Sequence, residues 1–353
     1  MEENRKYRLP GLDGIRAIAI LLIVLGHCGQ ADFWYGNCPL PHLPLPGGAL
    51  SIFFVLSGFL AGYYSETITD AKSYYLRKAK RLFPVYYIYI ILVVLVYLLI
   101  GRNTEVLNWK LLYYIVPAGI IPFCQAQGIL PFVHLWFLTP IVIAYLLFPI
   151  LLKAFMGGSR RCSVLILCIF FAALKWILYA TVGKETFAYR FISASQFDCI
   201  FGGMFLGLYI SDREGQVPQL FNHKTTNWLI WLAFLACGFY QNFIPSPVWN
   251  EFFGLLAAGM LLGLIGEEPN FHFCSRKWRF LSKISYHVYV IHILIIILSA
   301  MFFTALYDGE GMPLIISISA YVLMTGISIL VAWGLEKGIE IITKPRSEKV
   351  LDN

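Results

Sequence analysis

Residues 12–28 read LDGIRAIAILLIVLGHC, a hydrophobic stretch that contains an arginine, Arg16, and a histidine, His27. At about 100° and 1.5 Å per residue, a helix carries both side chains on one face, roughly 16 Å apart along its axis. Asp13 precedes Arg16 by three positions, so an ion pair between them is available on the helix. Ionisable residues are costly inside a membrane, so the stretch predicts a membrane helix that carries part of a functional site.

Apolar stretches of this kind recur along the whole chain. Of 353 residues, 59% are hydrophobic and 13% are charged, and the mean hydropathy is +0.70; a soluble domain carries about 25% charged residues. The pattern predicts an all-α fold, a single polytopic bundle of membrane helices. Residues 111–123 are apolar but contain two prolines, so we expect an interfacial or re-entrant segment there; if this segment crosses the membrane, the count of spans becomes eleven. Ten membrane spans are expected, at residues 12–28, 48–65, 84–100, 135–156, 163–181, 194–210, 227–244, 249–265, 282–304 and 313–336.

The distribution of lysine and arginine predicts the orientation of these spans. With ten spans, 21 of the 27 Lys and Arg residues lie on the side that holds both termini, which the positive-inside rule assigns to the cytoplasm. The expected organisation is a cytoplasmic tail at 1–11, a membrane domain at 12–336 and a second cytoplasmic tail at 337–353. Anionic lipid beside the cytoplasmic loops accounts for the net charge of +7, so no nucleic-acid partner is expected. The eight cysteines lack metal-ligand spacing, so no metal site is expected.

A basic segment lies on the predicted cytoplasmic side. Residues 74–84 read YYLRKAKRLFP, in which Arg77 and Arg81 share a helix face with Lys78 beside them. A concentrated positive face suits a ligand with several phosphates. An ordinary cytoplasmic loop has the same composition, so the segment alone leaves both interpretations open.

Histidines and a carboxylate mark the predicted outer half of the bundle. Asp198 lies at the same expected depth as His27, where a carboxylate could orient the imidazole. His292 is expected near the middle of the membrane, where it needs a hydrogen-bond partner. For each of these histidines, a structural role within the bundle and a role in a site both remain open. The same holds for Arg16, which could instead extend to the inner headgroups.

Two further segments carry candidate residues that line a site. Ser57 stands in SIFFVLSGFL beside a glycine, where close helix packing explains it better than a nucleophile does, because no G-x-S-x-G surrounds it. His134 and Trp136 stand in HLWFL at the outer end of a span, where tryptophan also suits the membrane interface.

Taken together, five of these segments resemble the acyltransferase-3 family of integral membrane acyltransferases. The segments are L-D-G-x-R with a histidine after ten further residues, F-F-V-L-S-G-F-L, a basic R-x-x-P-type segment, H-L-W-F-L and I-S-Y-x-x-Y-x-x-H; they stand at 12–27, 53–60, 77–84, 134–138 and 284–292. They occur in the family's order and cover residues 9–336. One departure is that residues 139–142 read TPIV, whereas many polysaccharide-modifying members carry acidic residues there. The resemblance therefore leaves the class of acceptor open.

The resemblance implies a ten-helix enzyme with cytoplasmic termini, most often in a bacterial cytoplasmic membrane. Such enzymes move an acyl group, usually acetyl, from cytoplasmic acyl-CoA to a hydroxyl of an extracytoplasmic or lipid-linked glycan. On that basis, Arg77, Lys78 and Arg81 are expected to bind the phosphates of the donor, and Arg16 a phosphate or the upper pantetheine arm. His27 is then a general base oriented by Asp198, or a covalent carrier of the acyl group.

The competing class is a secondary transporter or exporter of a glycan or a small anionic solute. It explains ten spans and intramembrane charges equally well. Transporters are often built from internal repeats, and the two halves of this chain show no convincing similarity to one another. The sequence therefore favours the acyltransferase.

Overall fold

In the computed structural model, helices are the regular secondary structure of the residues that it describes. These are residues 9, 11–31, 39–40, 47–65, 70–154, 160–240, 243–266, 273, 275–307 and 311–343, and they contain no β-strand. The all-α bundle predicted from the sequence is therefore confirmed for this part of the chain. Most of the predicted N-terminal tail lies outside the described residues, and the last helix continues to Thr343, past the predicted start of the C-terminal tail.

Long helices account for most of the fold, and short helices connect several of them. In chain order the helices are α1 (Leu12–Cys28), α3 (Ala49–Tyr63), α4 (Ala71–Leu99), α5 (Asn103–Val106), α6 (Leu111–Ile115), α7 (Ile120–Cys124), the 3₁₀-helix η3 (Leu130–Phe137), α8 (Leu138–Ala154), α9 (Arg160–Thr181), α10 (Phe187–Ser195), α11 (Phe197–Ser211), the 3₁₀-helix η4 (Gln219–Asn222), α12 (Lys224–Phe239), α13 (Trp249–Ile265), α14 (Arg276–Tyr307) and α15 (Leu314–Thr343).

Several of these helices can cross a membrane. Among the described residues, six helical stretches are long and apolar enough, and α3 and α13 are shorter apolar helices. The chain is thus built from membrane helices, while the number of ten spans stays a prediction. The six stretches are Ala71–Leu99, Leu130–Ala154, Arg160–Thr181, Phe187–Ser211, Arg276–Tyr307 and Leu314–Ile342.

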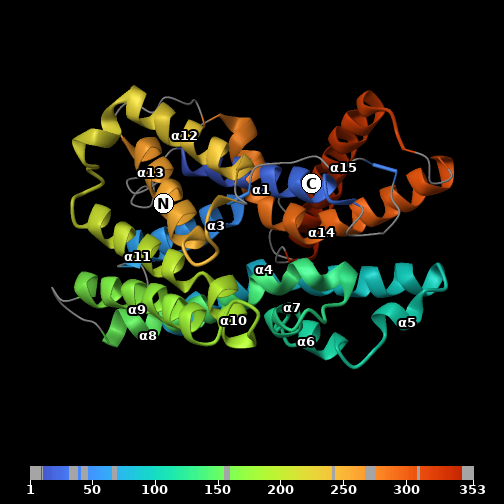
Figure 1. The fold of residues 1–353 in the computed structure, drawn as a ribbon, viewed down its shortest axis with the longest axis horizontal. Helices are drawn as coiled ribbons and strands as arrows, with labels where there is room; N and C mark the ends of the chain where they lie inside the picture. The colour runs from blue at the N-terminus through green and yellow to red at the C-terminus, as the bar shows by residue number, and fades with distance from the viewer. Residues whose placement is uncertain are drawn as a thin grey trace, which may run out of the picture.

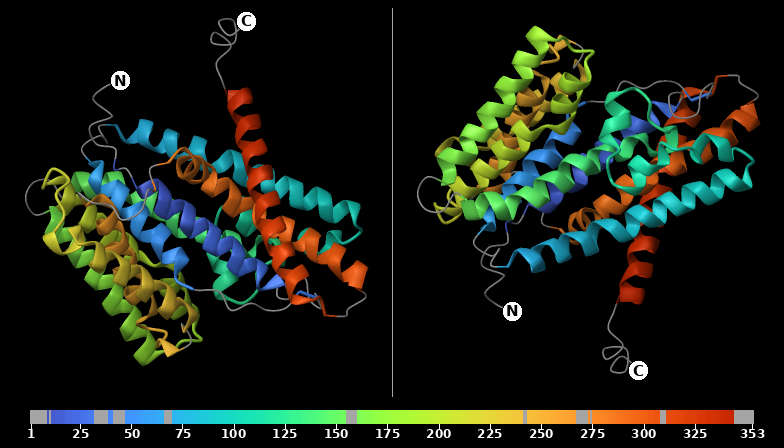
Figure 2. Two further views of the ribbon diagram at one scale, coloured as in Figure 1. Left: turned by 90° about the horizontal axis from the view of Figure 1, so that it is seen from above. Right: turned by 90° about the horizontal axis from the view of Figure 1, so that it is seen from below.

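Helix α1 lies between two groups of helices (Figure 1). On one side it packs against α14, which in turn packs against α15, and on the other side it packs against α3. Helices α9 to α13 form a compact group at one end of the molecule, and α15 extends away from the rest of the bundle (Figure 2). The helix that carries Arg16 and His27 is therefore central to the fold.

The closest helix packing in the bundle joins α3 to α11. Each helix carries two glycines four positions apart, Gly58 and Gly62 on α3 and Gly203 and Gly207 on α11. A Cβ atom on Gly58 would lie 1.8 Å from the carbonyl oxygen of Ile200, so the two backbones touch directly. Paired glycines at this spacing allow membrane helices to approach one another closely.

Three local features depart from, or refine, the sequence expectations. Helix α4 begins at Ala71 rather than near residue 84, because Asp70 caps its N-terminus by accepting hydrogen bonds from the backbone N–H groups of Lys72 and Ser73. Hydrogen bonding to Ser73 lowers the pKa of the Asp70 carboxyl. The basic segment and the following span therefore form one continuous helix.

The second feature is a break inside the predicted span 194–210. Gln196 adopts the left-handed conformation with φ 45°, which ends α10 and starts α11 in a new direction. The third is the apolar segment 111–123, where two short helices, α6 and α7, stand in place of a continuous span. That interruption agrees with the expectation drawn from its two prolines.

Candidate active site

A wide basic cavity, here called the basic vestibule, opens where α1, α4, α14 and α15 meet. Its volume is about 750 Å³. The lining residues include six basic side chains and three carboxylates, namely Arg16, Lys80, Arg81, Arg276, Arg279 and Lys283 with Asp13, Glu336 and Glu340.

The carboxylates of the basic vestibule are already engaged by neighbouring side chains. Glu336 pairs with Lys283 at 3.0 Å and with His287 at 3.0 Å, and Glu340 pairs with Lys283 and Lys337. Asp13 accepts a hydrogen bond from the Ser282 hydroxyl at 2.8 Å rather than forming a close ion pair with its helix neighbour.

Several arginines of the vestibule lack such partners. Among the described residues, no carboxylate lies within ion-pair distance of Arg81, Arg276 or Arg279. The vestibule therefore offers uncompensated positive charge, which suits a ligand that carries phosphates.

A narrow inner cavity continues from the basic vestibule into the bundle. Its volume is about 90 Å³, and Arg16, Arg81 and Tyr286 line both spaces. Ser57 lines the inner cavity, as does Lys78, whose Nζ lies 4.1 Å from the centre of the Tyr145 ring. Apart from these polar groups the walls are mostly leucine and aromatic residues, so the inner cavity fits a thin chain better than a charged head.

A third space, here called the histidine pocket, lies beyond Tyr289, which lines both it and the inner cavity. Its volume is about 220 Å³, and His27, His134 and Trp136 line it. His27 and Arg16 thus stand at opposite ends of one helix, each in its own cavity.

The histidine pocket is built on a contact between two imidazole rings. Nδ1 of His27 lies 2.7 Å from Nε2 of His292, and the rings stack with their centres 5.0 Å apart. Nδ1 of His292 lies 3.2 Å from the carbonyl oxygen of Val288, so this nitrogen donates a hydrogen bond. In neutral His292 the other nitrogen, Nε2, then accepts, and Nδ1 of His27 donates to it. Neutral His27 therefore carries its lone pair on Nε2, the position from which an imidazole accepts a proton.

His134 supports this arrangement from η3. Its Nε2 donates to the carbonyl oxygen of Val290 at 3.1 Å, and its ring meets the His292 ring edge to face at 5.4 Å. The Tyr289 hydroxyl donates to the carbonyl oxygen of His134. Helices α1 and α14 and the segment η3 are thus tied together where their histidines meet.

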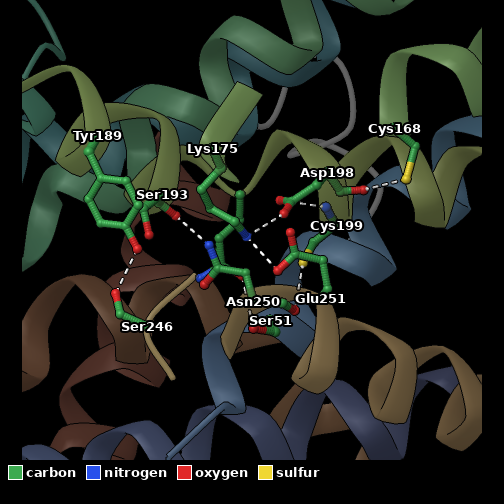
Figure 3. Close-up of polar contacts among 11 residues, drawn as sticks. Ser51, Cys168, Lys175, Tyr189, Ser193, Asp198, Cys199, Ser246, Asn250 and Glu251 are labelled. Carbon is green, nitrogen blue, oxygen red and sulfur yellow. Dashed lines mark hydrogen bonds and ion pairs between the residues drawn. The ribbon is translucent and has the colours of Figure 1, made fainter. Parts of the chain in front are cut away.

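Asp198 does not contact His27, which corrects the expected His–Asp pair. Oδ2 of Asp198 instead accepts from Nζ of Lys175 at 2.9 Å, and Lys175 also pairs with Glu251 at 2.5 Å (Figure 3). The side chains of Lys175 and Asp198 are 1% and 6% exposed, so this charge cluster is buried. The reason is geometric. The sequence predicts that Asp198 and His27 lie at the same depth in the membrane, but depth alone does not determine which neighbouring helix each side chain faces.

The structure gathers most of the residues singled out in the sequence around the three linked spaces. Arg77 is the exception on the basic side, since it lies on the exposed face of α4 and lines neither the vestibule nor the inner cavity. Sequence reasoning missed Arg276 and Arg279, although RKWR at 276–279 is a basic run with arginines one helical turn apart. It also missed Tyr289, which precedes His292 by three positions and shares its helix face.

Comparison with known proteins identifies the family of this chain. Residues 9–336 match the sequence model of the acyltransferase-3 family, which is described as 'Acyltransferase domain'. The chain is 34% identical over 110 residues to the O-acetyltransferase OatA of Staphylococcus aureus strain NCTC 8325. The aligned region covers 29% of this chain and 16% of OatA. It is 39% identical over 84 residues to another protein named as an O-acetyltransferase, from strain COL, covering 22% of this chain and 12% of that protein.

The chain thus spans about a sixth or less of the length of these curated relatives. No solved structure matches it. The family match extends across nearly all of the membrane bundle and includes every residue that lines the basic vestibule up to Glu336, the inner cavity and the histidine pocket. This multi-pass membrane protein is therefore a member of the acyltransferase-3 family.

Proposed function

We propose that this protein transfers an acetyl group from acetyl-CoA on the cytoplasmic side to a hydroxyl of a glycan or lipid-linked sugar on the opposite side of a bacterial cytoplasmic membrane. The observation that carries the proposal is that the three spaces adjoin one another through shared wall residues. Arg16 lines both the basic vestibule and the inner cavity, and Tyr289 lines both the inner cavity and the histidine pocket. The donor and the acceptor can thus approach one reaction centre from two sides.

The residues of the basic vestibule fit the nucleotide end of an acyl-CoA. CoA carries several phosphates, and Arg81, Arg276 and Arg279 provide guanidinium groups that have no carboxylate partner among the described residues. Arg16 holds a phosphate or the upper part of the pantetheine arm at the entrance to the inner cavity. The apolar walls of that cavity match the thin arm.

His27 acts as the general base in this proposal. Nε2 of His27 takes the proton from the acceptor hydroxyl, while His292 accepts the hydrogen bond from Nδ1 and keeps the ring oriented. The bound acyl-CoA supplies the acyl carbon, to which the acceptor oxygen bonds as the carbon–sulfur bond breaks. His27 then returns its proton to the departing sulfur. Asp198 has no direct part in these steps.

The family and the names of the relatives support acetyl as the group and oxygen as the accepting atom. A glycan acceptor is supported by the resemblance of the sequence motifs. Aromatic side chains at the histidine pocket suit a sugar ring, since Trp136 stacks on Phe123 with ring centres 4.7 Å apart.

The test is transfer of radiolabel from acetyl-CoA in membranes that contain the wild type, His27→Ala or the matched control His223→Ala. His223 is exposed and precedes α12, away from the histidine pocket. We expect label in a glycan or lipid-linked sugar fraction for the wild type and the control, and at most about a hundredth of it for His27→Ala. Undiminished transfer by His27→Ala contradicts the role of His27. If the wild type transfers no acyl group from acetyl-, succinyl- or longer acyl-CoA, the proposal that acyl-CoA is the donor is contradicted.

A further inference from the structure

A fourth cavity, here called the amide pocket, adjoins the histidine pocket and is not used by the mechanism above. Its volume is about 500 Å³, and it shares Phe123 and Trp136 with the histidine pocket. The stacked pair formed by these two rings is the common wall. The other lining residues are mostly polar, and they include Ser193, Gln196 and Asn250.

Two buried side-chain amides provide hydrogen-bonding groups in this pocket. Gln196 is 4% exposed, and its Oε1 accepts from the Ser51 hydroxyl at 2.8 Å. Asn250 is also 4% exposed, and its Nδ2 donates to the carbonyl oxygen of Ser193 at 2.7 Å. In the part of the chain that the structure describes, the opposite end of each amide, Nε2 of Gln196 and Oδ1 of Asn250, has no partner.

Buried amides normally have hydrogen-bond partners at both ends. Here the protein holds one end of each amide and leaves one donor and one acceptor at the same cavity. A hydroxyl group both donates and accepts, so it matches this pair. Gln196 is also held in the left-handed conformation at φ 45°, a costly arrangement for a residue other than glycine and one that is common at functional sites.

The buried charge cluster fixes the helices that carry these amides. Lys175 on α9 pairs with Asp198, two residues after Gln196, and with Glu251, the residue after Asn250 (Figure 3). One cation thereby holds the first turn of α11 against the first turn of α13. Asp198 is thus a positioning residue for the amide pocket.

We propose that the amide pocket binds a pyranose ring of the acceptor glycan, next to the ring whose hydroxyl is acylated. The ring's hydroxyls bond to Gln196 and Asn250, and its apolar face lies against Trp136. The neighbouring ring then extends past the stacked wall into the histidine pocket, where its hydroxyl meets His27. This assignment rests on the proposed function, because it names where the acceptor of that reaction binds.

The experiment compares Asn250→Ala with Asn227→Ala in the full chain. Asn227 is a matched control because it is 3% exposed and likewise donates to backbone carbonyls, yet it lies on α12 against Gly263 of α13 and does not line the amide pocket. Three quantities are measured for each: acetyl transfer to the acceptors of the native membrane, CoA binding to the purified protein, and the melting temperature. A second pocket variant, Gln196→Met, keeps the length of the side chain and removes its amide.

We expect both pocket variants to lose about tenfold or more of the transfer rate, as loss of a hydrogen bond to a buried partner implies, while CoA affinity stays within about twofold of the wild type. Asn227→Ala should keep its transfer rate for the same amount of folded protein. Equal transfer by Asn250→Ala and Asn227→Ala overturns the assignment. So does a joint loss of transfer and CoA binding in both pocket variants, because the defect then extends beyond the acceptor side. A wild type that neither binds CoA nor transfers acetyl overturns the proposed function itself, and the acceptor assignment with it.

Discussion

Nδ1 of His27 and Nε2 of His292 lie 2.7 Å apart, although 265 positions separate the two residues in the chain. The contact joins the first helix of the bundle to α14, and Val288 completes it by accepting from the other nitrogen of His292. The chain of a carbonyl, an orienting histidine and a basic histidine has the same logic as a catalytic triad, with imidazole in the place of the usual carboxylate.

This relationship predicts different effects for the two histidines. His27→Ala should lower the transfer rate by about 10²- to 10⁴-fold, the usual contribution of a general base. His292→Ala should cost less, because His27 keeps its lone pair but loses its orientation. His292→Gln, whose amide oxygen can accept a hydrogen bond, should recover part of that loss. The check is the acetyl-transfer rate together with CoA binding, which all three variants should retain. Equal rates for His292→Ala and His292→Gln would argue against an orienting hydrogen bond.

The basic vestibule predicts that arginines of α14 contribute to donor affinity. Arg276→Gln and Arg279→Gln should each weaken CoA binding by about tenfold, as expected for loss of a charge-assisted hydrogen bond. Lys277→Gln is the matched control, because Lys277 is exposed on the same helical turn and does not line the vestibule. Calorimetric titration with CoA at two salt concentrations measures the effect, which should shrink as salt rises. An equal loss in the Lys277 variant would point to general charge rather than to this cavity.

The glycine contact between α3 and α11 predicts a loss of stability when it is filled. A Cβ atom on Gly207 would lie 2.1 Å from the carbonyl oxygen of Phe59, so Gly207→Ala forces two helix backbones apart. Overpacking of this kind costs about 1–3 kcal/mol of unfolding free energy. Gly334→Ala is the control, because nothing lies within 4 Å of its Cβ position on α15. Thermal unfolding in detergent should separate the two variants, and similar melting temperatures would contradict the close contact.

The buried charge cluster predicts a large effect when its cation is removed. Lys175→Met leaves Asp198 and Glu251 side by side without a countercharge, and removal of one partner from a buried ion pair costs about 3–5 kcal/mol. Lys153→Met, at an exposed helix end, should change little. The melting temperatures of the two variants give the comparison. Restoration of stability by combining Lys175→Met with Asp198→Asn and Glu251→Gln would identify the uncompensated carboxylates as the cause.

Much of the fold could be predicted because membrane helices require long apolar stretches, which are visible in the sequence. Helix α1 begins and ends where its hydrophobic stretch does, at residues 12 and 28. The break at Gln196 could not be foreseen, because left-handed residues are usually glycine or asparagine and glutamine gives no such signal. The predicted span starts only at residue 84 because the first turns of α4 are polar, although the cap at Asp70 would have marked the start of one continuous helix.

The candidate site was predicted in its parts but not in its pairings. Spacing along one helix related Arg16 to His27, since helix geometry fixes that relationship. It could not relate His27 to His292 or Asp198 to Lys175, because those contacts depend on how helices are arranged around the bundle. Likewise, Arg276 and Arg279 counted toward the orientation of the spans, but composition does not reveal which basic residues line a cavity.

The position of Tyr289 matters for how well the protein keeps ions from crossing the membrane. Its ring packs against Phe137 and His292 at 5.0 and 5.7 Å between centres, its hydroxyl is tied to His134, and only 6% of it is exposed. Tyr289 therefore stands at the boundary between the inner cavity and the histidine pocket. Each charge that crosses a membrane dissipates about 2.3 kcal/mol per 100 mV of potential. If only the acyl end of a donor passes these packed rings, the proposed transfer between the two sides would take place without opening a leak for protons or ions.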